Sequence, residues 1–267
     1  MKDFCIILMF DYKFVKKSWQ TIQQIRDIGL YKGDIVCILA NDLHEKHYLL
    51  YQDDRIIYKD FFQYDTDPIL KHPKKLPEDP VKRELAHNCF PMKRKMIHYH
   101  GLYMFHKWFR ENYKKCLYID VGAQIFKPLN KLISLDCTGK LLTHSNAYPL
   151  YLPEDKLYTQ FDNVIFPELY EELNTLYNLD VDHFQATVML FDTVIIEDDT
   201  FDELWRLAYR YVNSVANEQA IMNIYFGCMR HCWQQLPIKD EETYYYDFYE
   251  RGSLKKTDYI IVKYPQT

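Results

Sequence analysis

The sequence predicts an α/β fold, a single domain in which a mostly parallel central sheet is flanked by helices. Two apolar runs of strand length, residues 4–10 and 34–40, enclose residues 15–28, whose apolar positions recur at helical spacing. Strand, helix and strand in this order form a βαβ unit, which implies a parallel strand pair. Apolar runs without alternation are typical of strands that are buried on both faces.

The middle of the chain is less regular. Residues 54–58 predict a third strand. Residues 65–91 carry five prolines among many charged residues, which predicts a long surface loop or flap. A helix is expected over residues 92–112, and it leads into a strand, residues 115–120, that ends in the carboxylate of Asp120.

The last third of the chain continues the alternation of helices and strands. The chain of 267 residues contains no internal repeat and no low-complexity linker, so we expect one domain over residues 1–267. The further strands are predicted at residues 141–144, 184–192 and 258–264, and the further helices at residues 167–177, 200–212 and 217–226.

Composition and charge exclude several classes of protein. A net charge of −5 argues against a protein that coats nucleic acid, because such binding needs a basic surface. The longest apolar run, residues 4–10, is far shorter than the roughly 20 residues that span a bilayer. Neither a transmembrane segment nor a signal peptide is therefore expected. Seven scattered cysteines make no disulfide framework and favour a reducing, cytoplasmic location.

Carboxylates close together in the sequence are the main candidates for chemistry. With seven glycines, the chain has no glycine-rich phosphate loop of the dinucleotide-binding or P-loop type. Acidic residues at or near a spacing of two occur at three places, and such a pair can hold a divalent cation that bridges a diphosphate. Asp65 with Asp67 lies in the proline-rich segment, and Asp180 with Asp182 precedes a strand. Only Asp120 follows the carboxyl end of a buried strand, where open α/β sheets bind ligands.

Four segments together resemble a known family. KCLYIDVGAQIFKPL (residues 115–129) resembles a conserved segment of the nucleotide-sugar glycosyltransferases with the GT-A fold, particularly the glycogenin-like group, family 8. FQATVMLFD (184–192), NEQAIMN (217–223) and WQQLP (233–237) are similar to later segments of the same family. Their order and spacing match over residues 4–264. The whole also resembles small transferases of large DNA viruses, which act in the host cytoplasm.

This resemblance implies an enzyme of glycan biosynthesis. It would transfer a sugar from a nucleoside-diphosphate sugar to a hydroxyl of a glycan or protein acceptor. Asp120 would orient the donor, through a metal ion or through ribose and phosphate contacts. If transfer inverts the anomeric centre, Glu218 is the candidate general base; if it retains configuration, Gln219 positions the sugar, and both alternatives stay open. The expected catalytic residues are Glu218, Gln219 and Asp120, and the expected donor-binding residues are Phe10, Asp11, Tyr12, Arg94, Lys95, Asp120, Gly122, Gln185 and Lys263.

Two departures from the family bear on its metal ion. Gly122 stands where the family has a second aspartate, and Lys263 lies in the strand where the family has a metal-binding histidine. Asp120 alone would then hold a manganese or magnesium ion, so we expect weak or absent metal dependence. Lys263 or Lys95 could supply the positive charge beside the diphosphate instead.

Two other functions fit parts of the sequence. The loss of the aspartate and the histidine would also suit a catalytically inactive GT-A-like module for binding or assembly. A nucleotidyltransferase would have a similar sheet, but it should carry a glycine-rich basic loop after the first strand. This chain has residues 11–15, DYKFV, at that position.

Overall fold

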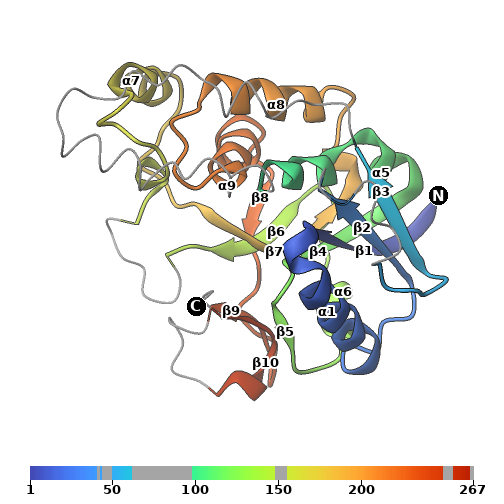
Figure 1. Cartoon of the computed structure of the whole chain (residues 1–267). Coiled ribbons are helices and arrows are strands. Elements are labelled where there is room, and N and C mark those ends of the chain that lie inside the picture. The colour runs from blue at the N-terminus through green and yellow to red at the C-terminus, as the bar shows by residue number, and fades with distance from the viewer. Residues whose placement is uncertain (41–42, 44–49, 62–97, 148–154, 249–254, 265–267) are drawn as a thin grey trace.

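The computed structural model contains a seven-stranded sheet and a smaller three-stranded sheet (Figure 1). It describes residues 1–40, 43, 50–61, 98–147, 155–248 and 255–264. The strands of the large sheet are β1 (Lys2–Phe10), β2 (Asp34–Leu39), β3 (Ile56–Asp60), β4 (Tyr113–Ile119), β6 (Leu141–Ser145), β7 (Phe184–Asp192) and β8 (Trp233–Gln235). The small sheet consists of β5 (Gln124–Ile125), β9 (Tyr244–Phe248) and β10 (Tyr259–Lys263).

Helices lie on both sides of the large sheet (Figure 1). The α-helices are α1 (Val15–Asp27), α5 (Lys107–Asn112), α6 (Asn130–Ile133), α7 (Pro167–Leu176), α8 (Thr200–Arg210) and α9 (Glu218–Met222). Helix α9 continues as the π-helix η7 (Asn223–Met229). The 3-10 helices are η1 (Tyr12–Phe14), η4 (His100–Phe105), η5 (Leu157–Gln160), η6 (Thr193–Ile195) and η9 (Lys256–Asp258).

The strand order of the large sheet is β3-β2-β1-β4-β7-β6-β8. Strands β1 to β4 run parallel to one another, and β6 is parallel to β8. Strand β7 is antiparallel to both of its neighbours, β4 and β6. The predicted class, a single α/β domain with a mostly parallel central sheet flanked by helices, is therefore confirmed.

The centres of β1, β2 and β4 are continuously apolar because both faces of the sheet are covered. In β1, Cys5 and Ile7 point into one buried cluster, which η4, α5, α8 and α9 complete on one face. Ile6 and Leu8 point into a second cluster, which α1 and the small sheet complete on the other face. Alternate side chains of a strand point to opposite faces, so a strand between two layers needs apolar residues at every position.

One expectation about a helix needs correction. The helix expected over residues 92–112 does not continue through His106, whose backbone is extended (φ −70°, ψ 141°) and whose ring accepts a hydrogen bond from the amide of Trp108. A 3-10 helix, η4, precedes this break, and the short helix α5 follows it. The 65–91 segment, Arg94 and Lys95 lie outside the described residues. Within the described ranges, none of the helices has the length and apolar character needed to cross a membrane.

Candidate functional site

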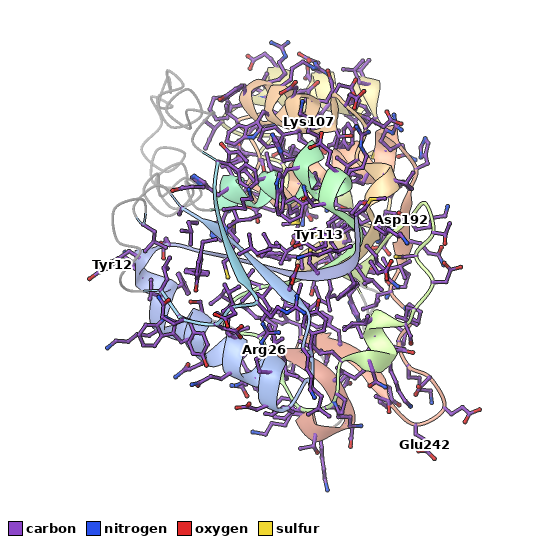
Figure 2. All side chains as sticks on the ribbon, turned by 90° about the vertical axis from the view of Figure 1, so that its right-hand side faces the viewer. Tyr12, Arg26, Lys107, Tyr113, Asp192 and Glu242 are labelled. Carbon is purple, nitrogen blue, oxygen red and sulfur yellow. The ribbon has the colours of Figure 1, made fainter. Side chains whose placement is uncertain are left out.

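The predicted site residues come together at one edge of the large sheet. Strands β1 and β4 are parallel and end at this edge, and the antiparallel strand β7 begins there. Asp120 directly follows β4, and its amide donates to the carbonyl of Thr187 in β7, at 2.8 Å. Tyr12 lies just beyond the end of β1, far from Asp192 at the other end of the sheet (Figure 2). This edge therefore lies at the carboxyl ends of parallel strands, where open α/β folds bind their ligands.

The turn after Asp120 has a conformation that favours glycine. Gly122 has φ +90°, in the region that side chains with a Cβ rarely adopt. Its amide donates to the Thr21 hydroxyl of α1, at 3.1 Å, and the amide of Ala123 donates to the Asp120 carbonyl, at 3.0 Å. The turn is thus anchored on α1, and it leads directly into β5.

Lys263 reaches Asp120 from the small sheet. It is the last residue of β10, and its side chain is only 7% exposed. Its ammonium donates to Oδ2 of Asp120, at 2.5 Å, and to the carbonyl of Val121, at 3.1 Å. A buried ammonium is stable only with such partners, so the pair joins the two sheets at the site.

Glu218 is the first residue of α9, and a strained residue precedes it. Asn217 has φ 54° and ψ −130°, which is rare for a residue other than glycine. The Glu218 side chain is 13% exposed, and its Oε2 has no hydrogen-bond partner among the described residues. Helix N-termini favour negative charge. The first residue of α9 is therefore a largely buried carboxylate, one oxygen of which has no hydrogen-bond partner among the described residues.

His98 and Tyr118 each respond to the charges of both carboxylates. Nδ1 of His98 lies 3.8 Å from Oε1 of Glu218. The charge of Glu218 is the main cause of a pKa for His98 above its usual 6.5, and Asp120 and Asp11 act in the same direction. The Tyr118 hydroxyl donates to Asp120. Burial, then the charges of Asp120 and Glu218, raise the pKa of Tyr118 well above its usual range. Asp120 and Glu218 thus share one electrostatic environment.

The two predicted glutamines are held by neighbouring polar groups. Gln219 Oε1 accepts from the amide of Ala186 in β7, at 2.9 Å, and its Nε2 donates to Gln160, at 3.3 Å. Gln185 Nε2 donates to Asn146, at 3.2 Å, and its Oε1 accepts from the Tyr246 hydroxyl, at 3.0 Å. Both side chains have fixed orientations. Gln219 also ties the start of α9 to the start of β7.

The residues at the end of β1 differ in what they can offer a ligand. The side chain of Phe10 is 1% exposed and belongs to the core, so only its backbone lies at the edge. Asp11 Oδ1 accepts from the amide of Phe14, at 3.1 Å, and caps η1. Tyr12 is half exposed. Of the three residues expected to hold the base, Tyr12 is the one with an accessible ring.

Solved structures with similar folds are glycosyltransferases. The galactosyltransferase LgtC, in complex with donor and acceptor sugar analogues, matches with a TM-score of 0.59 and 12% identity, over 97% of this chain and 86% of LgtC. The bifunctional glycosyltransferase WbbM matches with a TM-score of 0.54 and 16% identity, over 100% of this chain and 46% of WbbM. The chain has the GT-A fold. No protein-family model and no curated protein sequence matches it.

The GT-A turn of this chain does not fit a divalent cation. A divalent cation takes about six oxygen ligands, including at least one or two carboxylates whose oxygens face the ion. Here Asp120 is the only acid of the turn, and the Lys263 ammonium lies against its Oδ2. Among the described residues, no three acidic, histidine or cysteine side chains are grouped so as to hold a metal. A cation at Oδ2 would meet the like charge of Lys263.

His98 and Tyr118 are the site residues that the sequence analysis did not identify. Tyr118 lies two residues before Asp120, and side chains at this spacing share a face of a strand. The sequence could therefore have indicated that Tyr118 lies near Asp120. His98 had no such signal, because its partner Glu218 is distant in the sequence.

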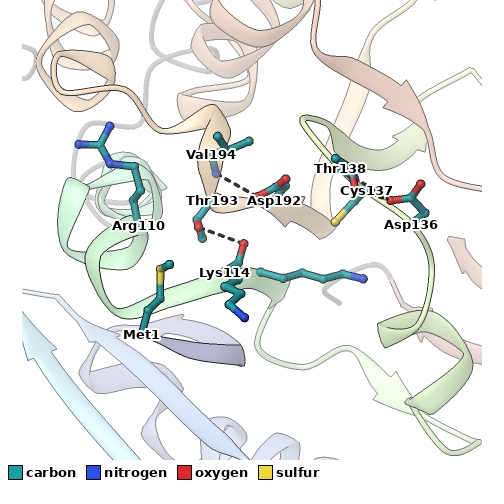
Figure 3. Close-up of a pocket in the computed structure, with 10 residues that line it drawn as sticks. Met1, Arg110, Lys114, Asp136, Cys137, Thr138, Asp192, Thr193 and Val194 are labelled. Carbon is teal, nitrogen blue, oxygen red and sulfur yellow. Dashed lines mark hydrogen bonds between the residues drawn. The ribbon is translucent and has the colours of Figure 1, made fainter.

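A cavity of about 420 Å³ lies at the opposite edge of the GT-A sheet, where β4 begins and β7 ends (Figure 3). Its cationic side chains already have partners. Lys114 pairs with Asp3, Lys115 donates to two carbonyls, and Arg110 donates to the Ile196 carbonyl and to Asp198. Its polar groups are engaged within the protein, so we place the candidate site at the Asp120 edge.

Proposed function

We propose that the chain is a glycosyltransferase that moves a sugar from a nucleoside-diphosphate sugar to a hydroxyl of a glycan or protein. The observation that supports this proposal is that Glu218, whose Oε2 is buried without a hydrogen-bond partner among the described residues, and Asp120 both act on Tyr118 at the carboxyl edge of the sheet. A carboxylate for the acceptor and a charged pair for the donor then share one electrostatic environment. The family 8-like assignment and a viral, cytoplasmic origin rest on the sequence resemblance and stay predictions.

In the inverting form of the reaction, Glu218 acts as the general base. The acceptor oxygen forms a bond to the anomeric carbon of the donor, and its proton passes to Glu218. The bond from the anomeric carbon to the diphosphate breaks, and the diphosphate oxygen keeps the electron pair. The charge of Glu218 raises the pKa of the neighbouring His98, and the N-terminus of α9 also favours the carboxylate form of Glu218.

In the retaining form, no strong base is needed and Gln219 orients the sugar. Its side chain is held between β7 and η5, which suits a positioning role. Both forms share the same donor site. There Asp120 accepts from the ribose hydroxyls and holds Lys263, the accessible ring of Tyr12 packs on the base, and Gln185 lines the sugar side.

Thermal-shift measurements with UDP-, GDP- and CMP-sugars test the donor class. A ligand at about 100 times its Kd should stabilise the protein by about 2.7 kcal/mol. We expect the stabilisation with a nucleoside-diphosphate sugar and not with CMP-sugars, which lack the second phosphate. Transfer of the sugar to water or to an added glycan is then measured through the release of the nucleoside diphosphate. A protein that binds a donor without releasing diphosphate would be the inactive binding module, and a protein that binds none would contradict the proposal.

A further inference from the structure

Lys263 is a buried lysine that has not used all of its hydrogen-bonding capacity. A lysine ammonium carries three donor hydrogens. Among the described residues, Asp120 and the Val121 carbonyl accept two of them, at 2.5 and 3.1 Å. A third hydrogen is therefore available to a ligand. The two existing contacts fix the position of the ammonium at the end of β4.

The space beside this ammonium is kept clear by Gly122. A Cβ at this glycine would lie 3.9 Å from Nζ of Lys263 and 3.8 Å from Cδ of Lys17. Any larger side chain would extend from a point between these two lysines. Because Gly122 has none, a ligand at the turn can approach the Lys263 ammonium, close to the Lys17 side chain.

Both partners of the ion pair are held by rigid elements. Strand β10 pairs with β5 and with β9, and its residues Ile260 and Ile261 are fully buried. Strand β5 follows the Asp120 turn almost directly, so the strand that carries Lys263 is paired with the strand that the turn leads into. The charge is thus already in place before a ligand arrives, which is the condition for strong electrostatic stabilisation.

We infer that Lys263 supplies the positive charge that faces the donor diphosphate, so that donor binding and transfer need no divalent cation. This inference rests on the proposed function. As the bond from the anomeric carbon to the diphosphate breaks, negative charge develops on the leaving oxygen. The third hydrogen of the ammonium donates to a phosphate oxygen and stabilises that charge. The hydrogen bond to Asp120 keeps the Lys263 ammonium in this orientation.

Isothermal titration calorimetry with UDP and GDP tests this inference, in EDTA and again in excess Mn²⁺. We expect the nucleotide that binds to have a Kd that differs by less than about twofold between the two conditions. Lys263→Met should weaken binding in EDTA by about tenfold or more, the usual effect of losing a charge-assisted hydrogen bond. Lys263→Arg should retain much of the affinity, because it keeps the charge.

Lys127→Met is the matched control for a lost lysine. Lys127 is another partly buried lysine that donates to a backbone carbonyl, that of Asp258, at 2.9 Å. It lies outside the site, so its variant should bind the nucleotide as the unaltered protein does. If Lys263→Met does not fold, the calorimetry of the unaltered protein in EDTA and in Mn²⁺ still tests the inference without any variant.

The outcomes separate this inference from the function on which it rests. Binding in EDTA that Lys263→Met weakens supports the inference. Binding only in Mn²⁺, or equal binding by Lys263→Met in EDTA, overturns the inference and leaves the glycosyltransferase standing. If neither UDP nor GDP binds in either condition, the proposed function itself fails.

Discussion

The ammonium of Lys263 lies 2.5 Å from Oδ2 of Asp120, although 143 positions separate the two residues. Asp120 follows a strand of the large sheet, and Lys263 ends a strand of the small one. One contact therefore joins the two sheets and also places a fixed positive charge at the predicted donor site. This double role shapes what substitutions at either residue should do.

Asp120→Asn should abolish transfer and also lower the melting temperature. The amide removes the counter-charge of the buried Lys263 ammonium, and a poorly satisfied buried group costs about 1–3 kcal/mol. Circular dichroism melts and a transfer assay measure the two effects. Asp120→Asn with Lys263→Met should recover part of the lost stability without recovering transfer. Equal transfer by Asp120→Asn would show that this carboxylate has no part in the reaction.

Glu218→Gln should lower turnover by at least about 100-fold, the low end for a lost general base. It should leave donor affinity nearly unchanged, because the donor is held at Asp120, Lys263 and the end of β1. Steady-state kinetics and donor calorimetry check both statements. Glu168→Gln is the matched control, because Glu168 also lies in the first turn of a helix, α7, away from the site. Full turnover by Glu218→Gln would leave a retaining transferase.

Gly122→Ala should weaken donor binding as well as stability. Its φ of +90° makes any Cβ costly, by about 1–2 kcal/mol. Gly139→Ala is the control for strain alone: Gly139 has φ +65°, and a Cβ there would meet nothing within 4 Å. Both variants should melt earlier, and only Gly122→Ala should change donor affinity in calorimetry. Equal donor affinity in both variants would argue against a ligand at the Asp120 turn.

His98 should titrate above pH 6.5, and Glu218→Gln should lower its pKa, because the charge of Glu218 is the main cause of the shift. A raised histidine pKa adds stability that is fully present below pH 6.5 and is lost as the pH rises through the folded-state value. The difference in melting temperature between unaltered protein and His98→Gln should therefore shrink over that range. NMR titration of the ring gives the pKa. His106, whose pKa is lowered chiefly by burial, should shift the other way.

Much of the fold followed from local patterns in the sequence. The apolar runs of β1 and β2 predicted parallel strands covered on both faces, and the order of helices and strands predicted one α/β sheet. The break at His106 was not predictable from the apolar spacing, because the aromatic residues on both sides of it pack into one cluster. Trp19 shows the same limit: it stands at a core spacing in α1 but is 39% exposed.

The sequence by itself determined that Asp120 follows a buried strand, that Gly122 leaves it without a second acid, and that Glu218 begins a helix. These are local facts, since strand ends, turns and helix starts depend on neighbouring residues. Only the tertiary structure decided that Lys263 pairs with Asp120 and that His98 lies beside Glu218. Such contacts join residues more than a hundred positions apart, and strand pairing and layer packing, which no local pattern encodes, bring them together.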